Sequence, residues 1–472
     1  MKTLVSTHEI LKKHLSTGCD ERIYLNDEGL VRYWIDLMDT SIINRGSCTC
    51  SPLSEESKKD LYYLLENNDF TNEEDFNDLI DKHTKELKSF INYEGEDGFE
   101  IFYGASGTDL IYLSLIFAKM LNPNKPILNL VTCLEELGSG AVKAVYGQYH
   151  VSNNQFEEPL PVGEIIDENL KLNVISHKAR TKDGQIIDQE KNITDNIKQY
   201  DDYSIIVNLV FGSKSGIKDD LDIVDKLNRP DIMYNIDMCQ LRHKKDIIND
   251  LLNKNGLVMI TGSKFYNSPP FCGAMLVPRS IYKKLINADW SYFDKFDKVF
   301  SKYDFPEEIR KFINHPKKKN VALQLRWACA LEEIKRFKKE PVDKANNKIE
   351  LWNSLVINEL DGIDCYEVMP GHELTNKTIV SFRVLKDGQY LNHKQLQTLH
   401  KSVVKVDYSK SHGFKTIFIG QPVAFEDKSF LRFAIGSVNV REFIRNDEKE
   451  FNTDKAIISI IKEKLSSFDM NE

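Results

Sequence analysis

Between residues 99 and 262, short apolar runs alternate with amphipathic segments, and this rhythm constrains the fold more than any other feature of the sequence. Each apolar run is long enough for a buried strand, and most are followed by residues at helical spacing. Strands that alternate with helices in this way form a largely parallel sheet that is covered on both faces. We therefore expect an α/β fold, a three-layer mostly parallel sheet with helices on both faces. The segments that carry the pattern are 99–104, 109–121, 126–131, 140–147, 204–210, 221–227, 232–237, 243–252 and 257–262.

The segments on either side of this stretch have a different character. The segments 55–67 and 74–91 have apolar residues at helical spacing, and no run typical of a buried strand accompanies them. A polar loop of small residues occupies 44–52. The end of the chain combines helical patterns with runs typical of antiparallel strands. We expect an N-terminal helical and loop segment at 1–95, a large α/β domain at 96–300 and a smaller C-terminal α+β domain with linking helices at 301–472. The C-terminal segments are helices at 306–313, 322–338, 344–360 and 453–465, and strands at 378–385, 414–420 and 429–436.

Composition narrows the class of protein. The chain of 472 residues has 63 Lys and Arg against 72 Asp and Glu, a formal net charge of −9, which does not favour a nucleic acid as partner. We find no stretch of ~18 apolar residues that could span a bilayer, and the first residues lack the apolar core of a signal peptide. The eight cysteines are scattered and lack the spacing of a metal site or a disulfide framework. We expect a cytoplasmic protein with reduced thiols, no membrane or nucleic-acid partner and no bound metal.

A lysine at the end of one apolar run is the sharpest local feature. The run 257–260 leads through Thr261 and Gly262 to Ser263 and Lys264, and small and proline residues follow as far as Ala274. In open α/β sheets, ligands bind outside the carboxyl ends of the strands. A buried lysine in that position has a lowered pKa and can form a Schiff base with an aldehyde, whereas a lysine on a surface loop remains the alternative.

Two more polar groups end other predicted strands. Asp237 closes the run 232–237, and Gln240 follows it. A carboxylate at a strand end can hold a pyridinium nitrogen in its protonated form, although Asp237 as a helix cap is an alternative. Ser106, Gly107 and Thr108 lie between a predicted strand and a predicted helix, where glycine, hydroxyls and free backbone N–H groups can together make a phosphate cradle, although an ordinary strand–helix turn is the alternative. The segment does not continue as the GxGxxG of a dinucleotide site.

Taken in chain order, these features resemble the fold-type-I pyridoxal-phosphate (PLP) enzymes, the aspartate aminotransferase superfamily, and are most similar to its class V aminotransferase and cysteine-desulfurase-like members. The resemblance covers residues 95–440. It implies PLP as cofactor, a homodimer, and an amino acid or amine as substrate. It also assigns the cofactor site: Ser106, Gly107 and Thr108 to the phosphate, Asp237 to the ring nitrogen, Gln240 and Asn208 to the phenolic oxygen, and Ser263 and Lys264 to the Schiff base.

The sequence also departs from that family. The stretch 131–140 has no aromatic residue or His to cover the cofactor ring, so a residue of 135–137 is expected there instead. The Asn-Glu-x-Gly continuation after Asn208 is absent, and Ser263 stands where many relatives have His. The segment 268–273 is similar to the Pro-x-Pro-Cys-Gly tail of some amino-acid decarboxylases, which keeps decarboxylation open.

Two arginines are candidates for binding a substrate carboxylate. Arg432, in Leu-Arg-Phe-Ala, resembles the arginine of the Leu-Arg-x-Ser strand in class V enzymes. A guanidinium suits this role because its planar fork donates two parallel hydrogen bonds. The alternative is an ion pair with a nearby acid such as Glu426. Arg45, in the N-terminal polar loop, is a second candidate, and His243 is expected to be a solvated residue at a helix start.

These observations favour a PLP-dependent enzyme that acts through a Lys264 Schiff base, first of all an aminotransferase, because an arginine-anchored carboxylate is poorly placed to depart. A PLP-dependent decarboxylase or a Cβ/Cγ lyase of the desulfurase kind is the alternative. Two other classes remain: a nicotinamide-dependent oxidoreductase, for which the spaced glycines are missing, and a non-catalytic protein with an aminotransferase fold.

Overall fold

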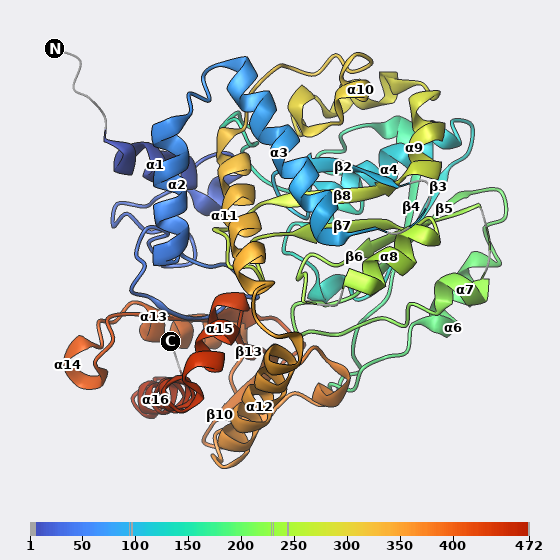
Figure 1. The fold of residues 1–472 in the computed structure, drawn as a ribbon. Coiled ribbons are helices and arrows are strands. Elements are labelled where there is room, and N and C mark those ends of the chain that lie inside the picture. Colours follow the sequence, from blue (N-terminus) through green and yellow to red (C-terminus); the bar gives the residue numbers. More distant parts are fainter. Residues whose placement is uncertain are drawn as a thin grey trace.

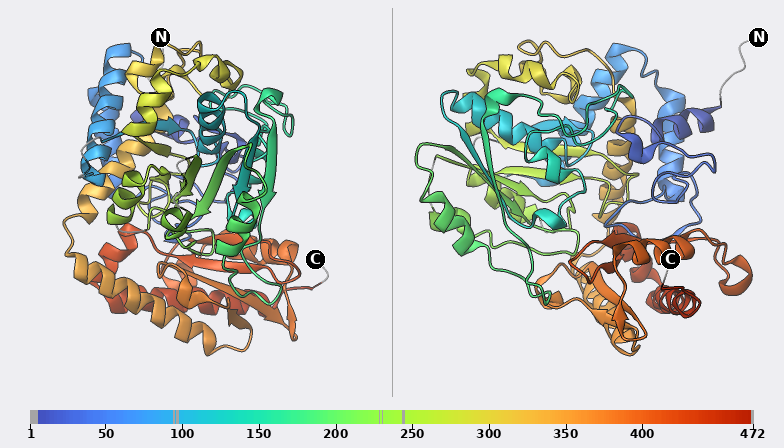
Figure 2. Two further views of the ribbon diagram at one scale, coloured as in Figure 1. Left: turned by 90° about the vertical axis from the view of Figure 1, so that its right-hand side faces the viewer. Right: turned by 180° about the vertical axis from the view of Figure 1, so that it is seen from behind.

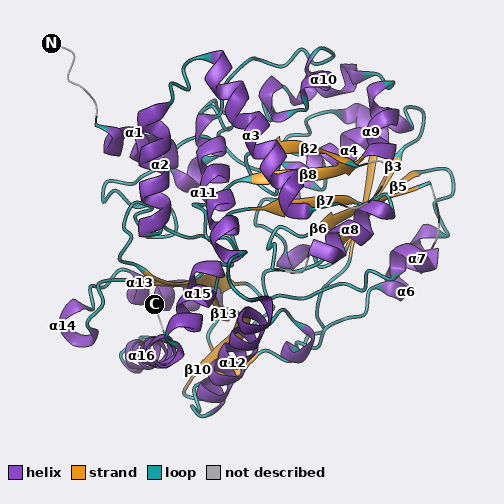
Figure 3. Ribbon diagram, in the orientation of Figure 1, coloured by secondary structure: helices purple, strands orange, loops and turns teal. Residues whose placement is uncertain are grey.

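A computed structural model describes residues 6–470 apart from 94, 96, 97, 228, 230, 243 and 244, so His243 lies outside the described residues. Figures 1 and 3 show a large sheet packed between helices, with a smaller sheet and its own helices beneath it. In the turned views of Figure 2, the C-terminal part of the chain forms this lower layer. The N-terminal helices lie beside the large sheet, and between the first and the second of them residues 43–45 join the small sheet.

The large sheet has the strand order β2–β8–β7–β6–β5–β3–β4. Strands β7, β6, β5, β3 and β4 pair in parallel, whereas β8 is antiparallel to both of its neighbours. The sheet is therefore mostly parallel, which confirms the α/β class expected from the sequence. The strands are β2 (Phe99–Gly104), β3 (Ile127–Val131), β4 (Leu172–Ser176), β5 (Ser204–Val210), β6 (Ile232–Asp237), β7 (Leu257–Thr261) and β8 (Gly273–Pro278).

Helices cover both faces of this sheet because alternate residues of its central strands face different hydrophobic cores. In β5, Ile205 and Val207 belong to one core, whereas Ile206 and Val210 belong to the other. The first core includes side chains of α3, α8 and α11, and the second includes side chains of α4 and α9, so the domain has three layers. The helices around the sheet are α3 (Glu73–Ile91), α4 (Leu110–Leu121), α5 (Ala141–Ala144), α6 (Glu190–Ile197), α7 (Ile223–Leu227), α8 (Lys245–Asn253), α9 (Arg279–Ile286), α10 (Glu307–Arg310) and α11 (Val321–Phe337).

The small sheet has the order β1–β12–β13–β10–β11, and β9 also pairs with β10. Its C-terminal strands are antiparallel, and β1, from the N-terminal segment, joins the edge in parallel with β12. The strands are β1 (Ile43–Arg45), β9 (Tyr366–Val368), β10 (Ile379–Lys386), β11 (Gln389–Tyr390), β12 (Ile417–Val423) and β13 (Phe430–Ala434). The remaining helices are α1 (Thr7–Leu15), α2 (Glu55–Asn67), α12 (Val342–Asp361), α13 (His393–Val404), α14 (Ser409–His412), α15 (Ser437–Arg445) and α16 (Asp447–Ser466).

Most of the expected elements have counterparts in the structure. Helix α2 has the bounds expected from its spacing, and α3 begins one residue earlier than expected. Strands β4 and β8 were not expected, and the short run at 140–147 forms only the brief helix α5. None of the helices in the described part of the chain is long and apolar enough to cross a membrane.

Candidate active site

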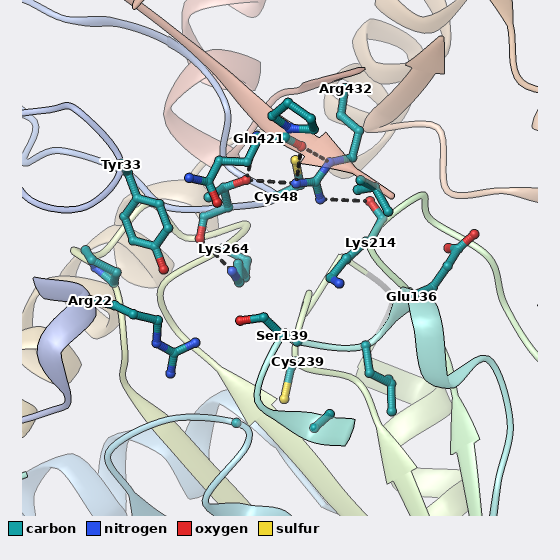
Figure 4. A pocket seen from close by; sticks show the side chains of 18 of the residues that line it. Arg22, Tyr33, Cys48, Glu136, Ser139, Lys214, Cys239, Lys264, Gln421 and Arg432 are labelled. Carbon is teal, nitrogen blue, oxygen red and sulfur yellow. Dashed lines mark hydrogen bonds between the residues drawn. The ribbon is translucent and has the colours of Figure 1, made fainter. Parts of the chain in front are cut away.

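A cavity of about 720 Å³ lies between the ends of the large-sheet strands and the small sheet. Figure 4 shows its interior. We call the side formed by the strand ends and the start of α4 the large-sheet wall, and the side formed by Thr49, Gln421 and Arg432 the small-sheet wall. Residues predicted from the sequence contribute to both walls. Those that line the cavity are Ser106, Gly107, Thr108, Asp237, Gln240, Ser263, Lys264 and Arg432.

Lys264 follows the buried strand β7 and is half-buried in the cavity. Its Nζ donates a hydrogen bond to the backbone oxygen of Thr49 at 2.6 Å, across the gap between the two walls. Burial lowers the pKa of Lys264 to about 8, and the nearby Arg432 acts in the same direction. A substantial fraction of this amine is therefore neutral, and nucleophilic, near physiological pH.

Asp237 is the last residue of β6 and lies in the same cavity. Its Oδ1 accepts a hydrogen bond from the backbone N–H of Cys239 at 2.8 Å, and no ion pair to it is present in the described part of the chain. Burial raises the pKa of Asp237, while Lys264 opposes that shift. Thr261, at the end of β7, donates to the backbone oxygen of Cys239 at 2.6 Å, which fixes the Asp237 and Lys264 segments relative to each other.

The turn between β2 and α4 presents donors to the cavity. Ser106 does not offer its hydroxyl freely, because its N–H and its Oγ–H both donate to Asp109 Oδ2 at 2.8 Å. In the part of the chain that the structure describes, the backbone N–H groups of Gly107 and Thr108 and the Thr108 hydroxyl have no protein acceptor. A Cβ at Gly107 would lie 2.6 Å from Cys239 Sγ, so this turn packs tightly against the segment that follows Asp237.

Arg432 is a buried cation on β13, with 3 % of its surface exposed. Its guanidinium donates to the backbone oxygen of Gln421 at 2.8 and 3.1 Å, to that of Lys214 at 3.2 Å and to Thr49 Oγ1 at 3.0 Å. Glu426, the acid considered as its partner from the sequence, pairs with Lys178 instead. Among the described residues no carboxylate forms an ion pair with Arg432, which leaves its charge available to an anion in the cavity.

Gln240 is held by a neighbouring arginine. Arg242 Nε donates to Gln240 Oε1 at 2.9 Å, and because a guanidinium can only donate, the amide nitrogen of Gln240 must point the other way, toward the backbone oxygen of Cys48 at 3.4 Å. Ser263 is buried beside Lys264 and lines the cavity.

Two predicted residues lie outside the cavity lining. Asn208 bonds Asn129 Oδ1 at 2.6 Å and accepts from Asn235 Nδ2 at 2.8 Å, so its amide forms part of a buried row across the sheet. Arg45 is 1 % exposed and donates to Asp454 at 2.5 Å and to Glu450 at 2.8 Å. These contacts occupy the side chain of Asn208, which the sequence analysis assigned to the cofactor, and that of Arg45, which it assigned to the substrate.

The structure adds residues that sequence reasoning missed. The N-terminal segment contributes Arg22, Tyr33 and Thr49, and α13 contributes its polar face. Lys214 lies in the loop after β5 and lines the cavity. Its segment, Gly-Ser-Lys-Ser-Gly, contains the residue types of a nucleotide-binding P-loop but not the spacing. The stretch expected to cover the ring, 135–137, does line the cavity, and within it Glu136 is paired with Arg180. Only the glycines around Lys214 gave a local signal.

Solved structures with the same arrangement identify the fold. The chain superimposes on the glutamate decarboxylase domain of diaminobutyrate-pyruvate transaminase and L-2,4-diaminobutyrate decarboxylase from Vibrio parahaemolyticus with a TM-score of 0.55 and 11% identity, over 91% of this chain and 81% of that one. It matches a phosphoserine aminotransferase from Cytophaga hutchinsonii (TM-score 0.53, 11% identity, 86% and 98% covered). It also matches the cysteine desulfurase CsdA of Escherichia coli (TM-score 0.55, 11% identity, 90% and 95% covered).

The chain has the fold of the fold-type-I PLP-dependent enzymes. The match extends over most of the chain. No protein-family model and no curated protein matches the sequence. The likeness is one of fold, and the chemistry of the site is argued from its own residues.

The residues of the large-sheet wall fit PLP. The free N–H groups of Gly107 and Thr108 lie at the start of α4, where the helix dipole favours a phosphate. The carboxylate of Asp237 has no cationic partner among the described residues, and a protonated pyridine nitrogen supplies one. Lys264 offers an amine that is partly neutral. The donor set therefore matches the phosphate, the ring nitrogen and the aldehyde of this cofactor.

Proposed function

We propose that this protein is a PLP-dependent aminotransferase that acts on an amino acid or amine. The observation that carries the proposal is the placement of Lys264, Asp237 and the turn 106–108 on one wall of one cavity. PLP, when bound, accepts into its ring the electrons that are released when a bond at the substrate Cα breaks.

Lys264 and Asp237 have separate tasks in this proposal. Asp237 binds the ring nitrogen and holds it protonated, because the ion pair between them is shielded from water. Lys264 would hold the cofactor through its amine, and, when not occupied in this way, it would carry the proton to and from the substrate Cα. A pKa of about 8 suits this work, since general acid–base catalysis is most efficient when the pKa lies near the working pH.

Arg432 favours transamination over decarboxylation. It faces Lys264 from the opposite wall and has no carboxylate partner in the described residues, so it can bind the substrate carboxylate. A carboxylate held by a guanidinium keeps its charge and does not readily leave as CO2. The bond that breaks at Cα is then the one to hydrogen.

An absorbance scan with matched lysine variants tests the cofactor assignment. The purified protein, supplied with PLP, should show a visible band that borohydride removes. Lys264→Ala should lose the band, whereas Lys214→Ala, which removes a second lysine with a pKa of about 8 from the same cavity, should keep it. Absence of the band in the wild-type protein would contradict the proposal.

A panel of amino acids then tests the reaction type. Pyridoxamine phosphate, CO2 and ammonia are measured in parallel after one turnover. Transamination predicts pyridoxamine phosphate without CO2, decarboxylation predicts CO2, and elimination predicts ammonia. We also expect a homodimer, and sedimentation at the concentrations of the assay tests that expectation; full activity of a separated monomer would contradict it.

A further inference from the structure

Lys214 is a second amine in the cavity, and the mechanism above gives it no task. It lies in the loop 212–216, where Gly212 and Gly216 adopt φ angles of 110° and 90° that favour glycine. Its backbone is fixed on both sides: its N–H donates to Glu136 O at 3.0 Å, and its carbonyl accepts from Arg432 Nη1 at 3.2 Å. Figure 4 shows its side chain extending into the cavity toward the space between Lys264 and Ser139.

The acids nearest to Lys214 are already engaged. Glu136 pairs with Arg180 at 3.0 Å and also accepts from Ser213 and Ser215, and Glu135 Oε1 accepts from the N–H of Ala179 at 2.7 Å. Lys214 Nζ itself reaches only the backbone oxygen of Glu135, at 3.4 Å, and no ion pair to it occurs within the described ranges. The ammonium therefore keeps donors free for a ligand.

Lys214 and Arg432 are neighbours, and each adds to the positive potential of the same space. Burial lowers the pKa of Lys214 to about 8, and Arg432 and Lys264 act in the same direction, while Glu136 and Glu135 oppose the shift. The chain carries a net charge of −9, yet its cavity gathers more cationic than anionic side chains. The cationic ones are Arg22, Arg32, Lys214, Lys264, Lys394, Lys401 and Arg432, and the carboxylates are Glu135, Glu136 and Asp237.

We propose that Lys214 binds a second acidic group of the substrate, so that the substrates are amino acids with an acidic side chain. Arg432 binds the α-carboxylate, and Lys214, joined to it through one backbone carbonyl, binds a carboxylate or phosphate at the far end. The proposal rests on the proposed function for the amino group of the substrate, but the anion site itself does not depend on bound PLP.

Unreactive acids of matched length test the site by calorimetry. Glutarate and 4-phosphonobutanoate carry two acidic groups, of the carboxylate and the phosphonate kind, whereas pentanoate carries one. The wild-type protein should bind at least one of the two diacids about 10-fold or more tighter than pentanoate, the gain typical of one charge-assisted hydrogen bond. The diacid that binds more tightly indicates whether the second acidic group of the substrate is a carboxylate or a phosphate.

Paired lysine variants locate the effect. Lys214→Gln should reduce the preference to within about twofold while pentanoate binding stays the same, and Lys214→Arg should restore much of it. Lys405→Gln removes the same charge from an exposed lysine just after α13 that lies outside the cavity lining and stacks on Trp34, 4.7 Å from the ring centre, and should keep the preference. Equal binding of all three acids by the wild-type protein, or an equal loss in both glutamine variants, would overturn the proposal. Since none of these acids reacts with PLP, such a failure is distinct from a missing visible band.

Discussion

The two walls of the cavity differ in how the chain builds them. The large-sheet wall comes from strand ends and one helix start, all between residues 104 and 264, and each of its groups lies close to a regular element. The small-sheet wall brings Thr49 next to Gln421 and Arg432, nearly four hundred residues away. In the proposed function, the first wall binds the cofactor and the second provides the cation for a substrate carboxylate. Variants on the two walls should therefore affect different steps.

The largest effect is expected on the large-sheet wall. Asp237→Ala removes the carboxylate that is proposed to hold the ring nitrogen protonated. We expect kcat to fall by about 1000-fold, which corresponds to an increase of about 4 kcal/mol in the activation free energy. PLP binding through the turn 106–108 and Lys264 should persist. Steady-state rates and the visible band measure both, and a variant with more than a tenth of the activity would contradict the assigned task.

On the small-sheet wall, Arg432→Gln should weaken substrate binding instead. Loss of a charged hydrogen-bond donor to a carboxylate raises KM by about 30- to 100-fold, with a smaller change in kcat. The visible band should remain, since Arg432 contacts Gln421, Lys214 and Thr49 and not the turn 106–108. An unchanged KM for a carboxylate substrate would show that Arg432 is not its anchor.

The pH dependence of PLP binding should depend on residues of both walls, Lys264 and Arg432. Below about pH 8 Lys264 is mostly protonated and cannot attack an aldehyde, so capture of PLP by the apo-protein should speed up about 10-fold between pH 7 and pH 9. Arg432→Gln should move the midpoint upward, because it removes a cation that lowers the pKa of Lys264. Stopped-flow absorbance measures the rate, and a midpoint near the ordinary lysine value would contradict the burial described here.

The smallest effect is expected at Thr49. Thr49→Val keeps the backbone oxygen that accepts from Lys264 but removes the hydroxyl that accepts from Arg432 and from the N–H of Gln421. Loss of about 1 kcal/mol corresponds to roughly a fivefold rise in KM. Thr49→Ser, which keeps the hydroxyl, is the matched control. If KM rose as much in Thr49→Val as in Arg432→Gln, and did not rise in Thr49→Ser, the Thr49 hydroxyl would have to contact the substrate itself.

The large-sheet wall was largely predictable because its signals are local. Lys264 follows an apolar run, Asp237 ends one, and the turn 106–108 separates a strand from a helix. Asn208 shows the limit of this reasoning. In the register of the sheet, Val210 pairs with Asp237 at the carboxyl ends of the strands, and Asn208 pairs with Asn235 two residues earlier. The side-chain amide of Asn208 therefore forms hydrogen bonds with residues of the neighbouring strands.

The small-sheet wall was predictable only in part because it is built from distant contacts. Arg432 was indicated by its short motif, but Arg45, the second candidate in the sequence, is bound by Asp454 and Glu450 of a helix some four hundred residues on. Strand β8 was missed since it follows a proline-rich turn, and β4 because its residues are only half-buried at the sheet edge. Thr49 acquires its place through tertiary contacts that no local pattern encodes, and the glycines around Lys214 are the only local signal of its loop.

The most direct test of the central claim is to find which lysine carries the cofactor. The protein is loaded with PLP, reduced with borohydride and digested, and the peptide that gains the mass of a reduced pyridoxyl phosphate is sequenced by mass spectrometry. We predict that this group sits on Lys264 alone, with the peptide that contains Lys214 unmodified. Attachment at Lys214, or at neither lysine, would contradict the account.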